Sequence, residues 1–211
     1  ADGVKERQKH ARINALDAAV TQATPELVPY LAEILAKGER AQDRRILTAL
    51  VKIGTGEAFQ VIAKTVGAKD PNTAIQAMHC AADSGVVTAI PNVRARLDDE
   101  RVNVRVIAAW ALAKLGQSEG RMRLRRLAAD KSLDEAMRAQ AVQCLRTVGD
   151  RGTAKLMASL EKSEMHAVAL EARVTRVWLD DAEAIQRIEN ALLDPESRVD
   201  AIQILCRTGR D

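Results

Sequence analysis

The chain has 211 residues, of which 32 are lysine or arginine and 29 are aspartate or glutamate, giving a formal net charge of +3. Apolar residues make up 47% of the sequence and aromatic residues only 2%, which excludes wholesale disorder and disfavours an aromatic-rich β-sandwich. Because no stretch approaches the roughly 18 consecutive apolar residues of a membrane helix, we expect no membrane contact and a cytoplasmic location.

The apolar periodicity predicts two alternating sets of helices, which we call A and B, joined by turns rich in glycine, aspartate and lysine. The expected A helices are 5–21, 41–53, 71–83, 102–115, 134–148, 165–178 and 197–207. The expected B helices are 26–37, 56–67, 87–97, 119–129, 151–162 and 181–193. We expect Asp99, Asp130 and Asp194, in the B-to-A turns, to cap the next helix.

Each A helix ends at a comparable position, which we call the anchor. The anchors are Ala23, Gly54, Gly85, Gly116, Gly149, Asp180 and Gly209, and successive anchors are 29 to 33 residues apart. Glycine at this position supplies the left-handed backbone conformation that closes a helix. The spacing therefore predicts one repeated unit along the whole chain.

Two positions relative to the anchor predict the core. Eight residues before it stand Ala15, Ile46, Ala77, Ala108, Ala141, Ala172 and Ala201. Eight residues after it stand Leu31, Ile62, Val93, Leu124, Met157 and Ile188. A small residue on helix A and a larger apolar residue on helix B indicate two buried stripes.

A single helix pair cannot bury its apolar stripe, but a stack of pairs can. The fold class predicted is therefore all-α, a right-handed α solenoid of about six and a half helix pairs in a single array, 1–211. Its units are 4–38, 39–69, 70–100, 101–132, 133–163, 164–195 and the partial 196–211. The last unit lacks a B helix, so it either caps the array or marks a truncated longer protein, and we favour truncation.

The segment 103–116, with Val-Arg, a central Ala-Ala and then Leu and Gly, resembles the HEAT-like repeat of phycobilisome lyases, and 136–149 is similar. Arginine stands eleven residues before the anchor at Arg12, Arg105, Arg138 and Arg198, whereas Asp43, Ala74 and Ala169 depart from the pattern. The resemblance implies an architecture shared by scaffolds, lyases and hydroxylases, and no single activity. We expect these arginines to bridge neighbouring helices and inter-repeat acids rather than to bind a ligand.

Basic residues on the B helices suggest one binding surface. We expect a concave basic ridge, suited to carboxylates or phosphates, made of Lys64, Arg94, Arg121, Arg125, Arg126 and Lys155. An equally open interpretation is a solvated face neutralised by Asp98, Asp99, Glu100 and Asp130.

The two tryptophans suggest a second surface. Trp110 and Trp178 stand in columns of the repeat that are otherwise mostly polar, and Ile107 lies one helical turn before Trp110. We therefore expect both indoles to be partly exposed on the A helices, as anchors for a partner or for self-association. The alternative is an indole lying flat over its own repeat junction.

No catalytic constellation stands out. His10, His79 and His166 are followed by Ala or Cys rather than by the glutamate of His-Glu iron sites, and three distant cysteines indicate core residues rather than a zinc site or a disulfide framework. We expect no cofactor, no metal and no enzymatic activity, and hence a protein-interaction scaffold with a protein partner, acidic if the basic ridge binds it. The alternatives are binding of nucleic acid or another anion by the arginines, and a bilin lyase-like activity, suggested only by the resemblance.

Overall fold

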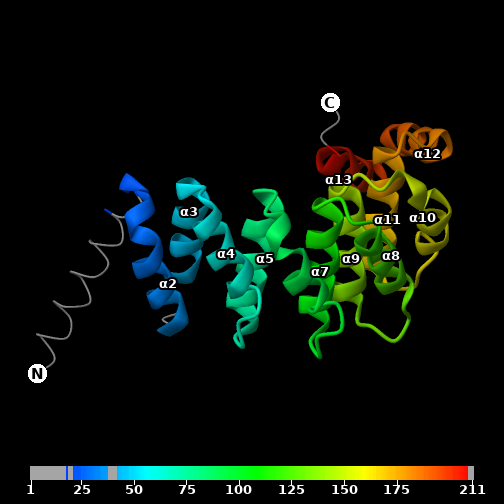
Figure 1. Ribbon diagram of the computed structural model, residues 1–211. Helices are drawn as coiled ribbons and strands as arrows, with labels where there is room; N and C mark the ends of the chain where they lie inside the picture. Colours follow the sequence, from blue (N-terminus) through cyan, green and yellow to red (C-terminus); the bar gives the residue numbers. More distant parts are fainter. Residues whose placement is uncertain (1–17, 19–20, 38–41, 209–211) are drawn as a thin grey trace, which may run out of the picture. The chain divides into compact units, whose positions relative to one another are not determined.

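The computed structural model describes residues 18, 21–37 and 42–208, and these are helical with no strand among them. Within each part of the chain, neighbouring helices pack on one another (Figure 1). The chain divides into two compact units, Ala1–Gly116 and Gln117–Asp211. The first predicted helix, 5–21, falls almost wholly outside the described residues.

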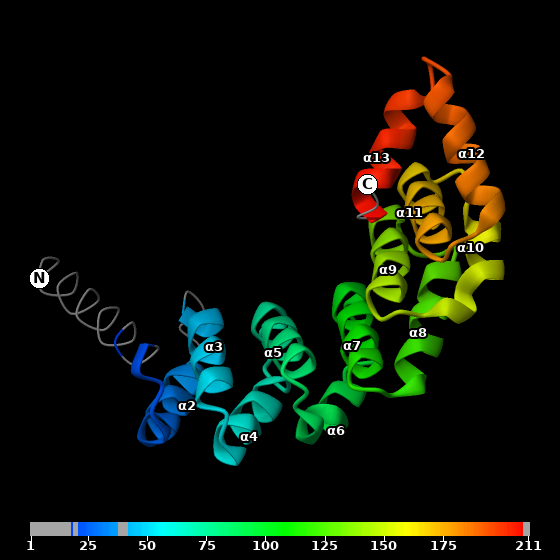
Figure 2. The same cartoon turned by 90° about the horizontal axis from the view of Figure 1, so that it is seen from above.

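The first unit follows the predicted alternation of A and B helices. Its elements are η1 (Pro25–Leu27), α2 (Val28–Lys37), α3 (Asp43–Ile53), α4 (Gly56–Thr65), α5 (Pro71–Asp83), η3 (Val87–Ala89), α6 (Ile90–Arg94) and α7 (Val102–Lys114). The A helices α3, α5 and α7 lie side by side (Figure 2), and α5 packs on both of the others. The B helices α2 and α6 each begin with one turn of 3-10 helix, two residues after the anchor.

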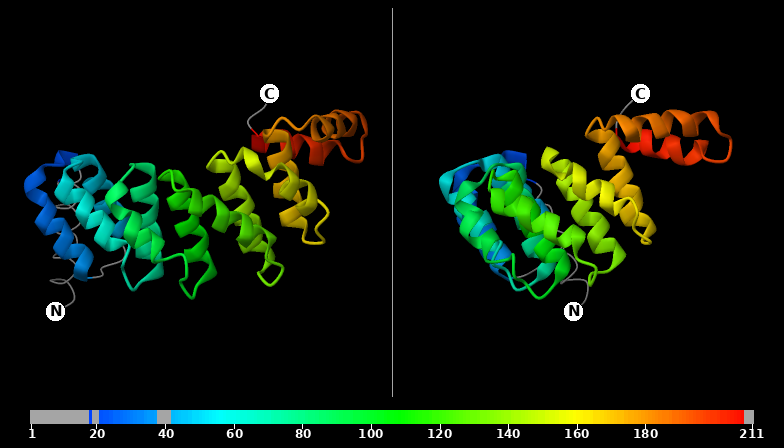
Figure 3. Two further views of the ribbon diagram at one scale, coloured as in Figure 1. Left: turned by 45° about the vertical axis from the view of Figure 1, so that its right-hand side comes forward. Right: turned by 90° about the vertical axis from the view of Figure 1, so that its right-hand side faces the viewer.

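The second unit repeats the arrangement. Its elements are α8 (Ser118–Ala129), α9 (Glu135–Thr147), η4 (Arg151–Thr153), α10 (Ala154–Leu160), α11 (His166–Trp178), α12 (Ala182–Leu193) and α13 (Arg198–Thr208). The A helix α11 packs on α9 and on α13, and α12 and α13 form a terminal helical pair (Figure 3). The predicted helix boundaries are confirmed to within a few residues.

The described anchors all have a left-handed backbone, which confirms the predicted closure of the A helices. The φ values are 45° at Ala23, 68° at Gly54, 67° at Gly85, 81° at Gly116, 67° at Gly149 and 63° at Asp180. Ala23 and Asp180 are the non-glycine residues with positive φ among the described residues. Their conformation shows that the position in the repeat, and not only glycine, imposes this turn, because a side chain makes a left-handed backbone unfavourable. Gly209 lies outside the described residues.

The two predicted core stripes are buried. The described residues eight before the anchors, from Ile46 to Ala201, are at most 1% exposed. Eight after the anchors, Leu31 to Met157 are fully buried, whereas Ile188 is half-buried in α12. Ala15 lies outside the described residues. Small residues on the A helices and larger ones on the B helices therefore form the core of each unit.

The predicted capping role of three aspartates is wrong. Asp99 and Asp130 each accept a hydrogen bond from the main-chain N–H two residues later, and Asp194 accepts from the Ser197 hydroxyl, so all three stabilise the turn itself. At α5 and α9 the capping carboxylates are those of Asp70 and Asp134. These caps stand immediately before the helix, where the first free N–H groups can be reached.

The recurring arginines that the structure describes have structural contacts, as the sequence predicts, but these are with main-chain carbonyls of the preceding segment and not with the expected acids. Arg105 donates to the carbonyls of Asp99 and Glu100, Arg138 to that of Ala128, and Arg198 to that of Leu192. Each guanidinium thus satisfies carbonyl groups at or just after the end of the preceding B helix, which have no partner within that helix. Arg12 lies outside the described residues.

Candidate interaction surfaces

The six residues of the predicted basic ridge belong to both units. They are Lys64 in α4 and Arg94 at the end of α6, then Arg121, Arg125 and Arg126 in α8 and Lys155 in α10. All are exposed except Arg125, which is half-buried. The predicted ridge thus divides into two groups, with Lys64 and Arg94 in the first unit and the other four residues in the second.

The outward face of α8 combines charge with an apolar side chain. Arg121 and Arg126 are exposed, and the apolar side chain of Met122 between them is 51% exposed. Helix α10, which carries the exposed Lys155, packs beside α8. We call Arg121, Met122, Arg126 and Lys155 the α8–α10 surface. It offers three cations and one adaptable apolar group to a partner.

Arg125 is committed to a structural contact. Its Nε and one terminal nitrogen lie 2.8 and 2.6 Å from the two carboxylate oxygens of Asp150. Asp150 is only 5% exposed and comes directly after the anchor Gly149. The same carboxylate accepts from the main-chain N–H of Gly152 at 3.2 Å. Arg125 therefore ties α8 to the next turn, and its charge is already compensated.

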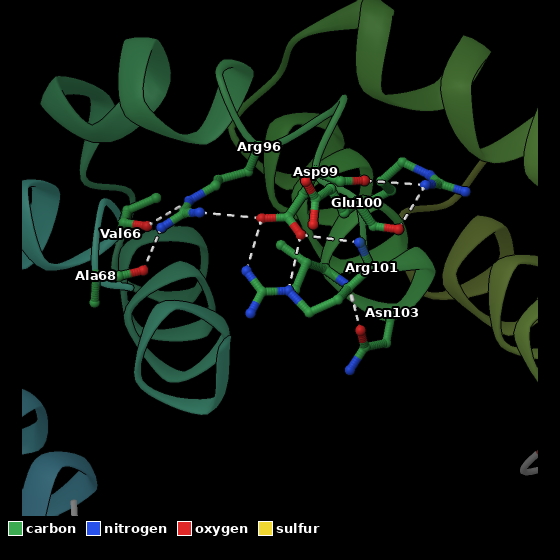
Figure 4. Close-up of polar contacts among 9 residues, drawn as sticks. Val66, Ala68, Arg96, Asp99, Glu100, Arg101 and Asn103 are labelled. Carbon is green, nitrogen blue, oxygen red and sulfur yellow. Dashed lines mark hydrogen bonds and ion pairs between the residues drawn. The ribbon is translucent and has the colours of Figure 1, made fainter. Parts of the chain in front are cut away.

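Asp99, one of the acids predicted to neutralise the basic face, pairs with nearby arginines outside the predicted ridge. The carboxylate of Asp99 lies 3.0 Å from Arg96 and 2.9 Å from Arg101 (Figure 4), and these bonds, chiefly that from Arg101, lower its pKa to about 2. Arg96 also donates to the carbonyls of Val66 and Ala68 in the preceding turn. This cluster joins two successive turns of the first unit.

The predicted exposure of Ile107 and Trp110 is wrong. Trp110 is 8% exposed and Ile107 5% exposed. The Trp110 indole lies against the His79 ring of α5, with ring centroids 4.6 Å apart, and the Lys114 ammonium lies 6.0 Å from the indole. Trp110 is therefore covered by the neighbouring A helix, whereas Thr48, Gln143 and Gln203 at the same position of other repeats are exposed. The pair consequently offers no exposed aromatic patch for a partner or for self-association.

Trp178, at the end of α11, is partly exposed, as predicted. The Arg151 guanidinium lies 5.9 Å from the centre of its ring. Such a cation over an indole adds modest stability at an exposed site. This ring remains accessible at one edge of the second unit.

Two carboxylate networks in the second unit escaped the sequence analysis. Glu161, at the end of α10, is 13% exposed and lies 3.8, 2.5 and 3.0 Å from Arg173, Arg176 and Arg187. Arg176 is itself buried and also pairs with Asp181, whose pKa it lowers. The partners come from α10, α11, the turn after it and α12, so residue spacing alone gave no signal for them.

The second network joins three consecutive A helices. The Glu171 carboxylate of α11 lies 2.9 Å from Arg146 of α9 and 2.7 Å from Arg207 of α13. One shared carboxylate thus holds two cations from neighbouring repeats. The geometry is that of a structural brace, because both of its oxygens are engaged within the fold.

A groove between α3 and α5 was also missed. Its volume is about 530 Å³, and its walls include Thr48 and Val51 of α3 and Gln76 and His79 of α5. The side-chain oxygen of Gln76 is buried and has no hydrogen-bond partner among the described residues. One sequence signal could have identified the groove. The residue six before the anchor is Thr48 in one repeat, His79 in the next and Trp110 in the one after, so the side chain at this position is smallest beside the groove.

Candidate metal ligands do not converge in the part of the chain described. No set of three His, Cys, Asp or Glu side chains there could hold a metal ion. Cys144 is buried, which raises the pKa of its thiol to about 12, and Cys80 is half-buried. The prediction that all three cysteines are core residues is wrong for Cys206, which is exposed on α13.

Within residues 18, 21–37 and 42–208, no helix has the length and apolar character needed to cross a bilayer. Comparison of the chain with models of known protein families and with curated proteins finds no match.

Proposed function

We propose that this chain is a non-enzymatic protein-interaction scaffold, built as a right-handed α solenoid of about six and a half HEAT-like helix pairs. The recurrence of one left-handed turn and one buried alanine column in both units supports repeated helix pairs. Arginines that bond to the preceding turn, at Arg105, Arg138 and Arg198, support contacts that recur from one repeat to the next. A repeat array of this kind presents an extended surface whose side chains are free to vary.

The α8–α10 surface carries the functional proposal. Arginine and methionine are enriched at protein interfaces relative to the rest of protein surfaces. Arg121 and Arg126 flank the exposed Met122, and the fold uses neighbouring Arg125, not these two, to hold Asp150. A guanidinium favours a carboxylate through paired hydrogen bonds. The partner expected is therefore an acidic protein segment.

Charge reversal on this surface tests the proposal. We would compare the wild type with Arg121→Glu plus Arg126→Glu, using a polyglutamate peptide at low salt and quantitative affinity capture of cellular partners. The matched control is Lys52→Glu plus Lys131→Glu, the same change of charge at exposed positions elsewhere. We expect the first variant to bind polyglutamate about tenfold more weakly and to lose partners that the control retains. Equal binding by both variants would remove the α8–α10 surface from consideration.

The same binding assay distinguishes the proposed protein partner from a nucleic-acid partner. A duplex or single-stranded oligonucleotide that binds more tightly than polyglutamate, with affinity falling steeply as salt rises, would replace the scaffold proposal with nucleic-acid binding. The exposed arginines of α8 serve either chemistry, so the comparison of ligands decides between them.

A further inference from the structure

The junction between α3 and α5 differs from the junction between α5 and α7 at one equivalent position. Trp110 of α7 and His79 of α5 both stand six residues before their anchors, and their rings are in contact. One repeat earlier the corresponding pair is His79 and Thr48. Because Thr48 carries no ring and imidazole is smaller than indole, a groove of about 530 Å³ remains between α3 and α5. At the α5–α7 junction, the Trp110 indole packs on His79 at the equivalent place.

Gln76, which lines the groove, carries a buried acceptor that has no donor in the described part of the chain. Gln76 Oε1 is inaccessible to solvent and has no partner among the described residues. A buried polar atom without a hydrogen bond costs about 1–3 kcal/mol in general, so a ligand that draws the Gln76 amide into the groove and donates a hydrogen bond to its oxygen recovers part of this cost. The indole N–H is a donor and never an acceptor. Its chemistry therefore complements Gln76.

The remaining walls suit an uncharged aromatic ring with an acidic neighbour. Burial lowers the pKa of the His79 imidazole, which keeps that ring neutral at physiological pH, and Val51 adds an apolar wall. At the rim, the Asp83 carboxylate lies 3.8 Å from the Lys114 ammonium, while Arg44 is exposed. The rim thus presents the Arg44 cation to whatever flanks the ring.

We propose that the α3–α5 groove binds the tryptophan side chain of a partner protein, with the Gln76 amide turning into the groove so that its Oε1 accepts from the indole N–H, and with the ring lying between Thr48 and His79. The volume falls within the range of roughly 300–1,000 Å³ typical of ligand sites. Arg44 favours an acidic residue beside that tryptophan. This inference deepens the proposed function and rests on it for the assignment of the indole to a protein.

Binding to the wild type provides the first test. N-acetyltryptophanamide and its 1-methylindole derivative would be titrated into labelled protein, following NMR shifts of the Gln76 side-chain amide and of the α3 and α5 backbone. We expect a dissociation constant on the order of 1 mM for so small a ligand. Methylation removes the N–H, so the derivative should bind about tenfold more weakly.

A matched pair of variants locates the hydrogen bond. Gln76→Met keeps the length of the side chain and removes the acceptor, and Gln140→Met makes the same change at the equivalent repeat position of α9. We expect Gln76→Met to bind the two ligands equally and Gln140→Met to discriminate between them as the wild type does. The wild-type comparison needs no variant, so it stands even where Gln76→Met fails to fold.

Three outcomes would overturn the inference. They are the absence of shifts in α3 and α5, equal wild-type affinity for both ligands, and binding of free indole without binding of N-acetyltryptophanamide, which would mark a small-molecule site. An acetylated Glu-Trp dipeptide amide should bind more tightly than its Lys-Trp counterpart, and the reverse order would contradict the role of Arg44. The charge-reversal assay on the α8–α10 surface reports separately, so loss of partner binding there without indole binding leaves the proposed function standing.

Discussion

The His79 imidazole and the Trp110 indole lie with their ring centroids 4.6 Å apart and their planes inclined at 47°. This tilted contact joins α5 to α7 through residues at the same position of successive repeats. It places the larger aromatic side chain in the interior of the first unit, although its column is mostly polar. Trp110 is therefore a packing residue.

Removal of this indole should be costly. We expect Trp110→Ala to lower the free energy of unfolding by about 3 kcal/mol, because it leaves a cavity beside His79. Trp178→Ala serves as the control and should cost clearly less, since its indole is only half-buried. Urea unfolding followed by circular dichroism measures both. Equal losses would contradict the packing role assigned to Trp110.

The contact between Arg125 and Asp150 predicts a second contrast within α8. Arg125→Ala leaves the buried Asp150 carboxylate without its bidentate partner, and we expect a loss of about 2 kcal/mol in unfolding free energy. Arg126→Ala, one residue on and exposed, should change it by less than about 0.5 kcal/mol. Chemical unfolding of the two variants checks this. A loss at Arg126 as large as that at Arg125 would show that the ion pair is not the cause.

Alanine substitutions at Gly85 and Gly56 test the effect of backbone conformation without that of steric crowding. A methyl group added at Gly85 or at Gly56 would meet no neighbouring atom within 4 Å, but only Gly85 has a positive φ, of 67°. We therefore expect Gly85→Ala to destabilise the protein by about 1 kcal/mol. Gly56→Ala should stabilise it by roughly 0.5 kcal/mol by restricting the unfolded chain. Thermal unfolding of both variants gives the signs, and a shared sign would refute the argument.

The arginine contacts of Asp99 predict that the protein loses stability in acid. Hydrogen bonds, chiefly from Arg101, lower its pKa to about 2 from an ordinary 3.8. A lowered pKa in the folded state stabilises the protein above the ordinary value, and this contribution disappears as the pH falls from 3.8 towards 2. Asp99→Asn should therefore cost about 1 kcal/mol at neutral pH, with a difference from the wild type that shrinks over that interval. Urea titrations at several pH values measure it.

The neighbouring exposed Asp98 provides the control for this pH dependence. Asp98→Asn leaves both arginine contacts of Asp99 intact. Its difference from the wild type should vary less between pH 4 and pH 2 than that of Asp99→Asn. A constant difference for Asp99→Asn across the acid range would rule out the ion pairs as its source.

Features that depend on local periodicity were predictable. The anchor spacing located the left-handed turns even where the residue is Ala23 or Asp180, since the same helix ending recurs at the same position. The alanine column eight residues earlier was placed in the core correctly because a small side chain is needed where helices approach closely. Both features depend on the conformation of one helix or one turn, so the residues at nearby positions in the sequence are enough to predict them.

Contacts between repeats were decided by tertiary packing. Asp150 pairs with Arg125, 25 residues earlier, and Glu171 pairs with Arg146 and Arg207 of two other helices. The positions of charged residues along the chain do not distinguish these pairs from many others. The burial of Trp110 and the groove at Thr48 likewise depend on which side chain of the adjacent helix faces each position. Periodicity tells which residues share a face of a helix, but only the packing of one helix on the next decides what that face meets, because burial and ion pairing are properties of neighbours in space.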